Sequence, residues 1–245
     1  MVHVNFAYAG KQFIRYMLSE EQEADAIILY SGWPGEIDNK QTMEFLVSEG
    51  FHVFNPVYPG LYQSHGAFLE DNIIEEQEAF FEVLKSGIID NLYTQKQETF
   101  RINKTIVFGS SFGGSIALGV AAKQEIDKLV LFAPVWDWSK QEGLDEELAF
   151  AKRAFKNVYK IQTTNLQEAL LKLPEIQPTY YEEKITSDIL VLHDPQDEIV
   201  PYEQTEEITL PKQVITHPYG HSMSEPLEAY WQEILSFLST HLRSA

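Results

Sequence analysis

The chain has 245 residues, of which 44% are hydrophobic and 13% aromatic, which is enough apolar material for one sizeable core. Acidic residues outnumber basic ones by 37 to 18, and the resulting formal net charge of −19 disfavours nucleic acid and anionic membrane surfaces as partners. The absence of cysteine excludes disulfides and thiolate chemistry. The sequence shows neither a signal-peptide pattern at its start nor an apolar run approaching about 18 residues, so we expect a cytoplasmic protein that does not span a membrane.

Short apolar segments alternate with amphipathic ones along most of the chain. Strands are expected within residues 2–18, on both sides of the turn dipeptide Ala9-Gly10, and then at 26–30, 51–57, 105–108, 128–132, 188–192 and 213–216. Helices are expected at residues 41–48, 69–85, 115–123 and 227–242. This alternation predicts an α/β fold in which a mostly parallel central sheet has helices on both faces.

The alternation is interrupted between residues 137 and 184. Apolar residues recur at helical spacing from Leu144 to Val158, and a second helical pattern follows Asn165 and ends before Pro174. The segment is too short to enclose a core of its own. We therefore predict a single domain over residues 1–245, with a helical cap insertion at about 137–184.

The clearest chemical motif is a G-x-S-x-G pattern within residues 109–114, and its serine is Ser111. An apolar strand comes directly before the motif, and a helix of small residues directly after it. A serine on such a turn lies at a helix N-terminus, where free N–H groups and the helix dipole favour developing negative charge. Ser111 is therefore a candidate nucleophile; the alternative is an ordinary glycine-rich turn between a strand and a helix.

Three motifs together resemble the α/β-hydrolase superfamily, in which a nucleophile elbow, an acid and a histidine follow one another along the chain. Residues 193–201 (HDPQDEIVP) are similar to the H-G-x-x-D-x-x-V-P stretch of that superfamily, with Asp194 in place of the usual glycine and Asp197 at the acid position. Residues 219–222 (YGHS) resemble its histidine loop and contain His221. The resemblance extends from about residue 24 to 242 and implies a catalytic triad of Ser111, Asp197 and His221.

The chemistry of acyl transfer explains why each member of this triad is needed. A serine hydroxyl needs a base within hydrogen-bond reach as it attacks, and His221 can accept that proton and return it to the leaving group. Asp197 would hold the other ring nitrogen and stabilise the imidazolium. Three alternatives stay open: His217 as the base, and Asp194 or Asp137 as the acid.

An oxyanion hole requires fixed N–H donors about 3 Å from the developing charge. The resemblance implies that Phe112 provides one backbone N–H and Trp33 the other. Trp33 lies in residues 31–35 (SGWPG), which are similar to the superfamily's H-G-x-x-G loop with Ser31 in place of the histidine. The alternative for residues 31–35 is a simple turn rich in glycine and proline.

Two tryptophans, Trp136 and Trp138, follow the strand at 128–132 and lead into the expected cap. They are candidates for lining a substrate pocket, although aromatic residues at such positions also serve as packing. No cluster of histidine, aspartate and glutamate has metal-ligand spacing, and neither a G-x-G-x-x-G motif nor a P-loop is present, so neither metal nor cofactor is expected.

The charge of the expected cap differs from that of the whole chain. Seven of the 18 basic residues fall within it, which predicts that the charge over the site is less negative than the total: Lys140, Lys152, Arg153, Lys156, Lys160, Lys172 and Lys184.

The favoured function is hydrolysis of a small carboxylic ester through an acyl-enzyme intermediate. A second hypothesis is a peptidase or amidase, because Gly113-Gly114 and the D-x-x-V-P stretch also resemble the catalytic domain of prolyl-oligopeptidase-type enzymes. A third is a catalytically silent binding protein with a hydrolase-like fold, which would require a missing or displaced triad member. In the two enzymatic hypotheses the partner is a small-molecule ester or amide.

Overall fold

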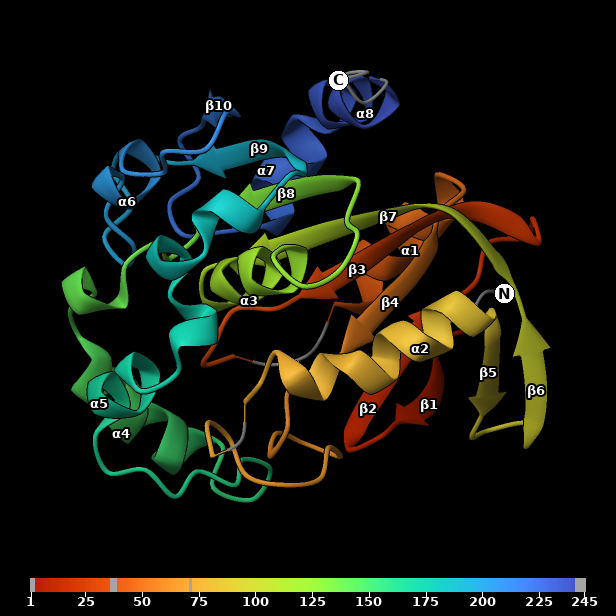
Figure 1. The fold of residues 1–245 in the computed structure, drawn as a ribbon, viewed down its shortest axis with the longest axis horizontal. Coiled ribbons are helices and arrows are strands. Elements are labelled where there is room, and N and C mark those ends of the chain that lie inside the picture. The colour runs from red at the N-terminus through yellow and green to blue at the C-terminus, as the bar shows by residue number, and fades with distance from the viewer. Residues whose placement is uncertain (1–2, 36–38, 71, 241–245) are drawn as a thin grey trace.

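An eight-stranded sheet of order β1-β2-β4-β3-β7-β8-β9-β10 forms the centre of the computed structural model, which describes residues 3–35, 39–70 and 72–240 (Figure 1). The strands are β1 Asn5–Ala9, β2 Gln12–Met17, β3 Glu23–Tyr30, β4 His52–Pro56, β7 Arg101–Ser110, β8 Lys128–Phe132, β9 Asp188–His193 and β10 Lys212–Thr216. The pairs β1–β2 and β2–β4 are antiparallel, and the remaining neighbours are parallel. The predicted α/β fold with a mostly parallel sheet is confirmed.

Helices cover both faces of the sheet. Helices α1 (Lys40–Ser48), α7 (Ser224–Ala229) and α8 (Trp231–Ser239) lie on one face, and α2 (Glu78–Ser86) and α3 (Phe112–Ala121) lie on the other (Figure 1). The side chains of β3 alternate between two apolar clusters: Ile27 and Leu29 join the one under α1 and α8, while Ala26 and Ile28 join the one under α2 and α3. This period of two places apolar side chains on both faces of a central strand.

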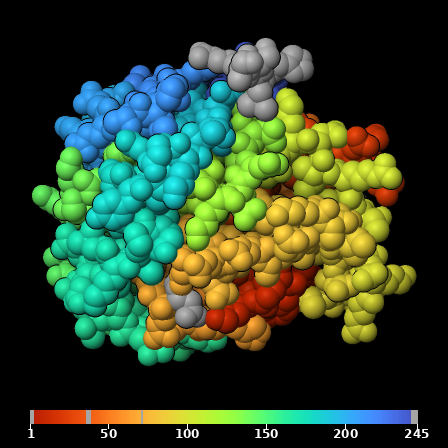
Figure 2. Space-filling model, in the orientation of Figure 1, coloured from red at the N-terminus to blue at the C-terminus, as the bar shows by residue number. Residues whose placement is uncertain are grey.

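The segment from 137 to 184 is helical, as its apolar spacing predicts. It contains α4 (Leu144–Ala154), α5 (Leu166–Leu171) and the short helical turns η2 Trp138–Lys140, η3 Pro174–Ile176, η4 Pro178–Tyr180 and η5 Glu182–Lys184. The N–H groups of Tyr62 and Phe68 donate to carbonyls at Val158 (2.6 Å) and Lys160 (2.9 Å). In Figure 2 the green and teal atoms of this segment adjoin the orange atoms of the loop that follows β4. Its buried leucines join the apolar cluster under α2 and α3.

Several expected boundaries differ from the structure. Residues 69–85 form a helix only from η1 (Glu75–Gln77) onward, because the Asn72 side chain accepts the N–H groups of Ile74 and Glu75 and so begins the helix late. The final helix is interrupted at Tyr230, where φ is −113°, and residues 241–242 of its expected range lie outside the described residues. A hairpin of β5 (Ile88–Asn91) and β6 (Lys96–Thr99) was not expected, and a four-residue helix, α6 (Glu203–Glu206), follows β9.

Gly119 of α3 lies where the helix meets η3 and the residues before α2. A methyl group at this position would come within 2.5 Å of the Glu175 carbonyl oxygen and 2.8 Å of the Ile74 Cδ1 atom. Helix propensity alone predicts that Gly119→Ala raises the free energy of unfolding by about 1 kcal/mol. We expect the opposite, a loss of about 1–3 kcal/mol in urea unfolding, because overpacking outweighs propensity. A gain in stability would contradict this packing. Ala121→Gly in the same helix should cost about 1 kcal/mol or more, because it lowers helix propensity and also removes a buried methyl group.

Candidate active site

The predicted site residues come together at the edge of the sheet where the parallel strands end. Ser111 follows β7, the loop of residues 31–35 follows β3, Asp197 follows β9 and His221 follows β10. In open α/β sheets ligands bind in the crevice outside the carboxyl ends of the strands. The topology therefore assembles one site from four segments far apart in the sequence.

The turn that carries Ser111 is unusually tight. Ser111 has φ of 53° and ψ of −119°, a backbone conformation that is strained for a residue other than glycine. A methyl group at Gly113 would lie 2.1 Å from the Tyr30 carbonyl oxygen, and one at Gly109 would lie 2.5 Å from the Gly113 carbonyl oxygen. Only glycine at these two positions permits α3 to begin so close to β3 and β7. The strained turn is the geometry that a nucleophile elbow requires.

Asp197 and His221 are joined directly. The Asp197 Oδ2 atom lies 2.8 Å from His221 Nδ1, and the Asp197 side chain has no exposed surface, whereas the His221 side chain is 23% exposed. Because a carboxylate accepts, Nδ1 of His221 donates in this pair. The other ring nitrogen, Nε2, is then free to act as an acceptor.

The Asp197 carboxylate is charged although it is buried. Burial alone would raise the pKa of Asp197, but hydrogen bonds from His193 and His221 and from the backbone N–H of Ile199 more than offset it, so that the pKa lies below its usual range. The Oδ1 atom accepts the N–H groups of Ile199 at 2.8 Å and Val200 at 3.0 Å. The site thus holds the negative charge of Asp197 against the Nδ1 atom of His221.

His193, at the end of β9, is a supporting residue that the sequence did not single out for this role. Its Nε2 lies 2.9 Å from the Val200 carbonyl oxygen and 3.4 Å from Asp197 Oδ2, and its Nδ1 lies 2.7 Å from the Thr205 hydroxyl. Because a carbonyl only accepts, Nε2 carries the proton. His193 therefore presents a positive edge to the Asp197 carboxylate.

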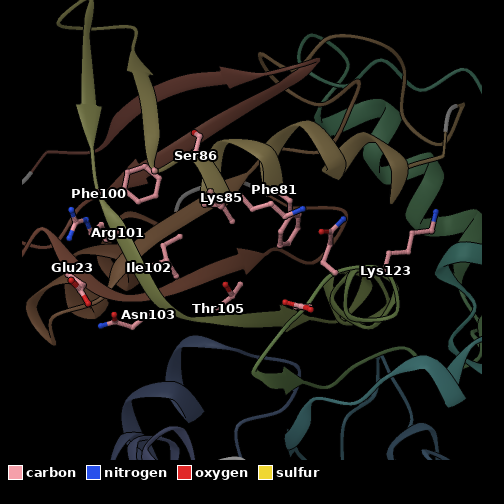
Figure 3. A pocket seen from close by; sticks show the side chains of 14 residues that line it. Glu23, Phe81, Lys85, Ser86, Phe100, Arg101, Ile102, Asn103, Thr105 and Lys123 are labelled. Atoms are coloured by element: carbon pink, nitrogen blue, oxygen red, sulfur yellow. The ribbon is translucent and has the colours of Figure 1, made fainter.

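Ser111 and His221 line the same hollow, which has a volume of about 420 Å³. Its described lining also includes residues 31–35, Glu147 of α4 and Ile199 beside the acid loop. A larger hollow of about 890 Å³ lies near Glu23 and Arg101, where β3 and β7 begin (Figure 3). It contains none of the predicted site residues and lies at the opposite edge of the sheet, so the smaller hollow is the candidate active site.

The two N–H groups expected to form an oxyanion hole have no acceptor among the described residues. No hydrogen bond of the described chain uses the N–H of Trp33 or of Phe112. The loop of Trp33 lies against the nucleophile, since a methyl group at Gly32 would lie 3.4 Å from the Ser111 Cβ atom. Trp33 lines the hollow together with Ser111, and Phe112 directly follows Ser111 as the first residue of α3.

The loop has support although Ser31 replaces the usual histidine. The Asn39 amide donates to the Ser31 hydroxyl at 2.8 Å, and the Tyr58 hydroxyl donates to the Ser31 carbonyl at 2.7 Å. At the other end of the loop, the Tyr159 hydroxyl accepts the Gly35 N–H at 3.1 Å and lies 2.5 Å from the Gly35 carbonyl oxygen. Because Tyr159 follows α4, the helical segment contributes to holding the loop.

The alternative acids have other partners. Asp194 accepts the N–H groups of Gln196 at 2.8 Å and Gly220 at 2.6 Å, and these hydrogen bonds lower the pKa of Asp194. Asp194 thereby anchors the residue that precedes His221. Asp137 accepts the Ser139 N–H at 2.9 Å and begins the turn η2. Neither carboxylate is placed on the histidine ring that Asp197 contacts.

The alternative base, His217, does not line the hollow that contains Ser111. Its Nδ1 accepts the Tyr219 N–H at 3.3 Å, and burial lowers its pKa. The two tryptophans are also buried and do not line that hollow. The Trp138 ring packs on Phe112 with centroids 5.7 Å apart, and the backbone N–H of Trp136 donates to Oε1 of Gln204 at 2.9 Å.

Within residues 3–35, 39–70 and 72–240, no group of three or more histidine, aspartate and glutamate side chains is placed to hold a metal ion. None of the helices in the same residues combines the length and the apolar character needed to cross a bilayer.

Comparison with known proteins identifies a family and a fold. The model of the family described as "Uncharacterised protein family (UPF0227)" matches residues 71–239. No curated protein matches the sequence. Among solved structures, acetyl xylan esterase 1 from Thermoanaerobacterium sp. is similar with a TM-score of 0.63 and 17% identity, over 96% of this chain and 82% of the other.

Two further structures show the same similarity. An esterase from Exiguobacterium antarcticum has a TM-score of 0.66 and 16% identity, over 97% of this chain and 99% of its own. The acylaminoacyl peptidase of Pyrococcus horikoshii has a TM-score of 0.65 and 13% identity, and the similarity covers this whole chain but 42% of the peptidase. Together with the sheet described above, these similarities show that the fold is that of the α/β-hydrolase superfamily.

The buried carboxylate predicts a pH dependence of stability. The pKa of Asp197 is lower in the folded protein than in the unfolded chain, where it is about 3.9. Its charge therefore stabilises the fold above about pH 4, and this stabilisation is lost as the pH falls toward the folded pKa. In urea unfolding, the stability difference between the wild type and Asp197→Asn should be larger at about pH 6 than at about pH 3. A difference that stays constant over this range would contradict the buried, ionised carboxylate.

Proposed function

Since the chain belongs to the uncharacterised protein family UPF0227 and has the α/β-hydrolase fold, we propose that it is a serine hydrolase that cleaves small carboxylic esters with Ser111, Asp197 and His221. The observation that carries this proposal is the 2.8 Å contact between Asp197 and His221 beside the hollow that His221 shares with Ser111. A charged acid bonded to a histidine, and a serine on a strained turn that lines the same hollow, are the components that acyl transfer requires.

In the proposed reaction the Ser111 hydroxyl attacks the ester carbonyl carbon while Nε2 of His221 takes its proton. Asp197 stabilises the imidazolium, and the N–H groups of Trp33 and Phe112 hold the oxyanion of the tetrahedral intermediate. The intermediate collapses, and the alcohol leaves with the proton from His221. Water then attacks the acyl carbon while His221 takes its proton, and His221 returns that proton to the Ser111 oxygen as the carboxylic acid is released. The reaction requires neither metal nor cofactor.

The helical segment of residues 137–184 is proposed to act as a cap insertion of this single domain. Two contacts support that role. Glu147 of α4 lines the hollow, and the Tyr159 hydroxyl holds Gly35 at the end of the loop that carries Trp33. Through these contacts the cap forms part of the wall of the hollow.

A peptidase or amidase activity is the second candidate. The same residues can attack an amide, and the fold is similar to 42% of an acylaminoacyl peptidase. Comparing the hydrolysis of p-nitrophenyl acetate with that of aminoacyl p-nitroanilides decides between ester and amide preference. A catalytically silent binding protein is disfavoured, because none of the three triad residues is missing and Ser111 shares its hollow with His221.

Substitution of the triad tests the proposal. Ser111→Ala and Asp197→Asn should each lower kcat/KM for p-nitrophenyl acetate by about 10³-fold or more, because the first removes the nucleophile and the second allows the wrong histidine tautomer. Asp137→Asn is the matched control, since its carboxylate begins η2 and should change kcat/KM by about two-fold at most. Full activity in Ser111→Ala, or equal losses in Asp197→Asn and Asp137→Asn, would overturn the assignment.

A further inference from the structure

Glu147 is a charged side chain in the candidate active site that the reaction above does not use. It lies in the first turn of α4 and lines the 420 Å³ hollow together with Ser111 and His221. Apart from His221, it is the one ionisable residue in the described lining of that hollow. A negative charge is therefore built into the wall that faces the proposed nucleophile.

The Glu147 carboxylate lacks a partner within the described part of the chain. No hydrogen bond or ion pair to its side chain is present there, and His221 is the nearby residue that influences its pKa. Burial raises the pKa of Glu147, and the nearby His221 partly opposes that shift. A partly desolvated carboxylate without a partner is unfavourable, and a cation that enters the hollow relieves this cost.

No lysine or arginine in the described lining of the hollow balances the negative charge of Glu147. None of the seven basic residues of the segment from 137 to 184 is among the described residues that line the hollow. Lys140 pairs with Glu207 at 2.7 Å, and Lys172 pairs with Glu168 at 2.6 Å. With a net charge of −19 on the whole chain, the molecule repels anionic substrates and attracts cationic ones.

Resting on the serine hydrolase function proposed above, we propose that Glu147 selects substrates that carry a cationic group, such as an ammonium, close to the scissile bond. The carboxylate binds that group while Ser111 attacks the acyl carbon. Glu147 is thus a specificity-determining residue, and an exchange of its charge alters the choice between substrates of the same shape.

A pair of substrates that differ in charge but not in shape tests this inference. Acetylthiocholine carries a quaternary ammonium, and 3,3-dimethylbutyl thioacetate has a carbon atom in place of that nitrogen. The released thiol is measured with a thiol-reactive dye, to which this cysteine-free chain contributes no background. The quantity compared is the ratio of kcat/KM for the cationic substrate to kcat/KM for the neutral one.

The wild type should give a ratio of about ten, falling as the ionic strength is raised. Glu147→Gln should bring the ratio to about one, and Glu147→Lys should bring it below one. Glu146→Gln is the matched control, because it removes the same charge from the neighbouring, exposed position of α4 and should leave the ratio unchanged. Circular dichroism of each variant establishes that it is folded.

A wild-type ratio near one, or a ratio that Glu147→Gln and Glu146→Gln change equally, would overturn the inference while leaving the hydrolase proposal intact. Equal losses on both substrates in Glu147→Gln would also overturn it, because they indicate a general effect on His221. Failure of the wild type to hydrolyse either thioester or p-nitrophenyl acetate would instead overturn the proposed function, and this inference with it.

Discussion

The close packing of α3 against β3 is the contact on which the candidate site depends. The helix begins so near the sheet that a side chain at Gly113 would collide with the Tyr30 carbonyl. The chain must therefore reverse within one residue after β7, and Ser111 takes the positive φ that this reversal imposes. Its side chain consequently lies at the edge of the sheet, beside the first N–H groups of α3, where developing negative charge is favoured.

The same edge accommodates a buried negative charge. Asp197 is tolerated there because two histidines and the N–H groups of Ile199 and Val200 surround its carboxylate. This network fixes one ring nitrogen of His221, while Asp194 fixes the preceding residue through the Gly220 N–H. The two aspartates therefore have different partners. Asp197 orients the His221 ring, and Asp194 holds the loop that carries His221.

The alternation of apolar strands and amphipathic helices was sufficient to predict the fold, because burial on both faces of a parallel sheet leaves a simple pattern in the sequence. Helix boundaries were predicted less well where a local side chain decides them, as at Asn72, or where the backbone breaks without a sequence signal, as at Tyr230. The order of motifs predicted a triad whose members the structure brings to one edge, and their chemical role remains a prediction.

Other parts of the site have no signature in a single sequence. Glu147 looks like any acidic residue in the first turn of a helix, and only the packing of α4 over the hollow distinguishes it from Glu146. Likewise, nothing near Ser31 in the sequence indicates that Tyr58 supports this loop, or that Tyr159 does so from a distant segment. Periodicity reports which face of an element is apolar, whereas the contacts between loops depend on how the elements assemble.

The local charge at the hollow can be compared with the net charge of the chain. The seven basic residues between 137 and 184 were expected to make the charge over the site less negative than the total, but the residue that this segment contributes to the described lining of the hollow is Glu147. The proposed hydrolase function depends on Ser111 as the nucleophile. The most direct measurement is peptide mapping by mass spectrometry after reaction with a fluorophosphonate probe. If Ser111 is the nucleophile, there is one adduct, on the peptide that contains Ser111, and none in Ser111→Ala. An adduct on another residue, or labelling that persists in Ser111→Ala, would contradict it.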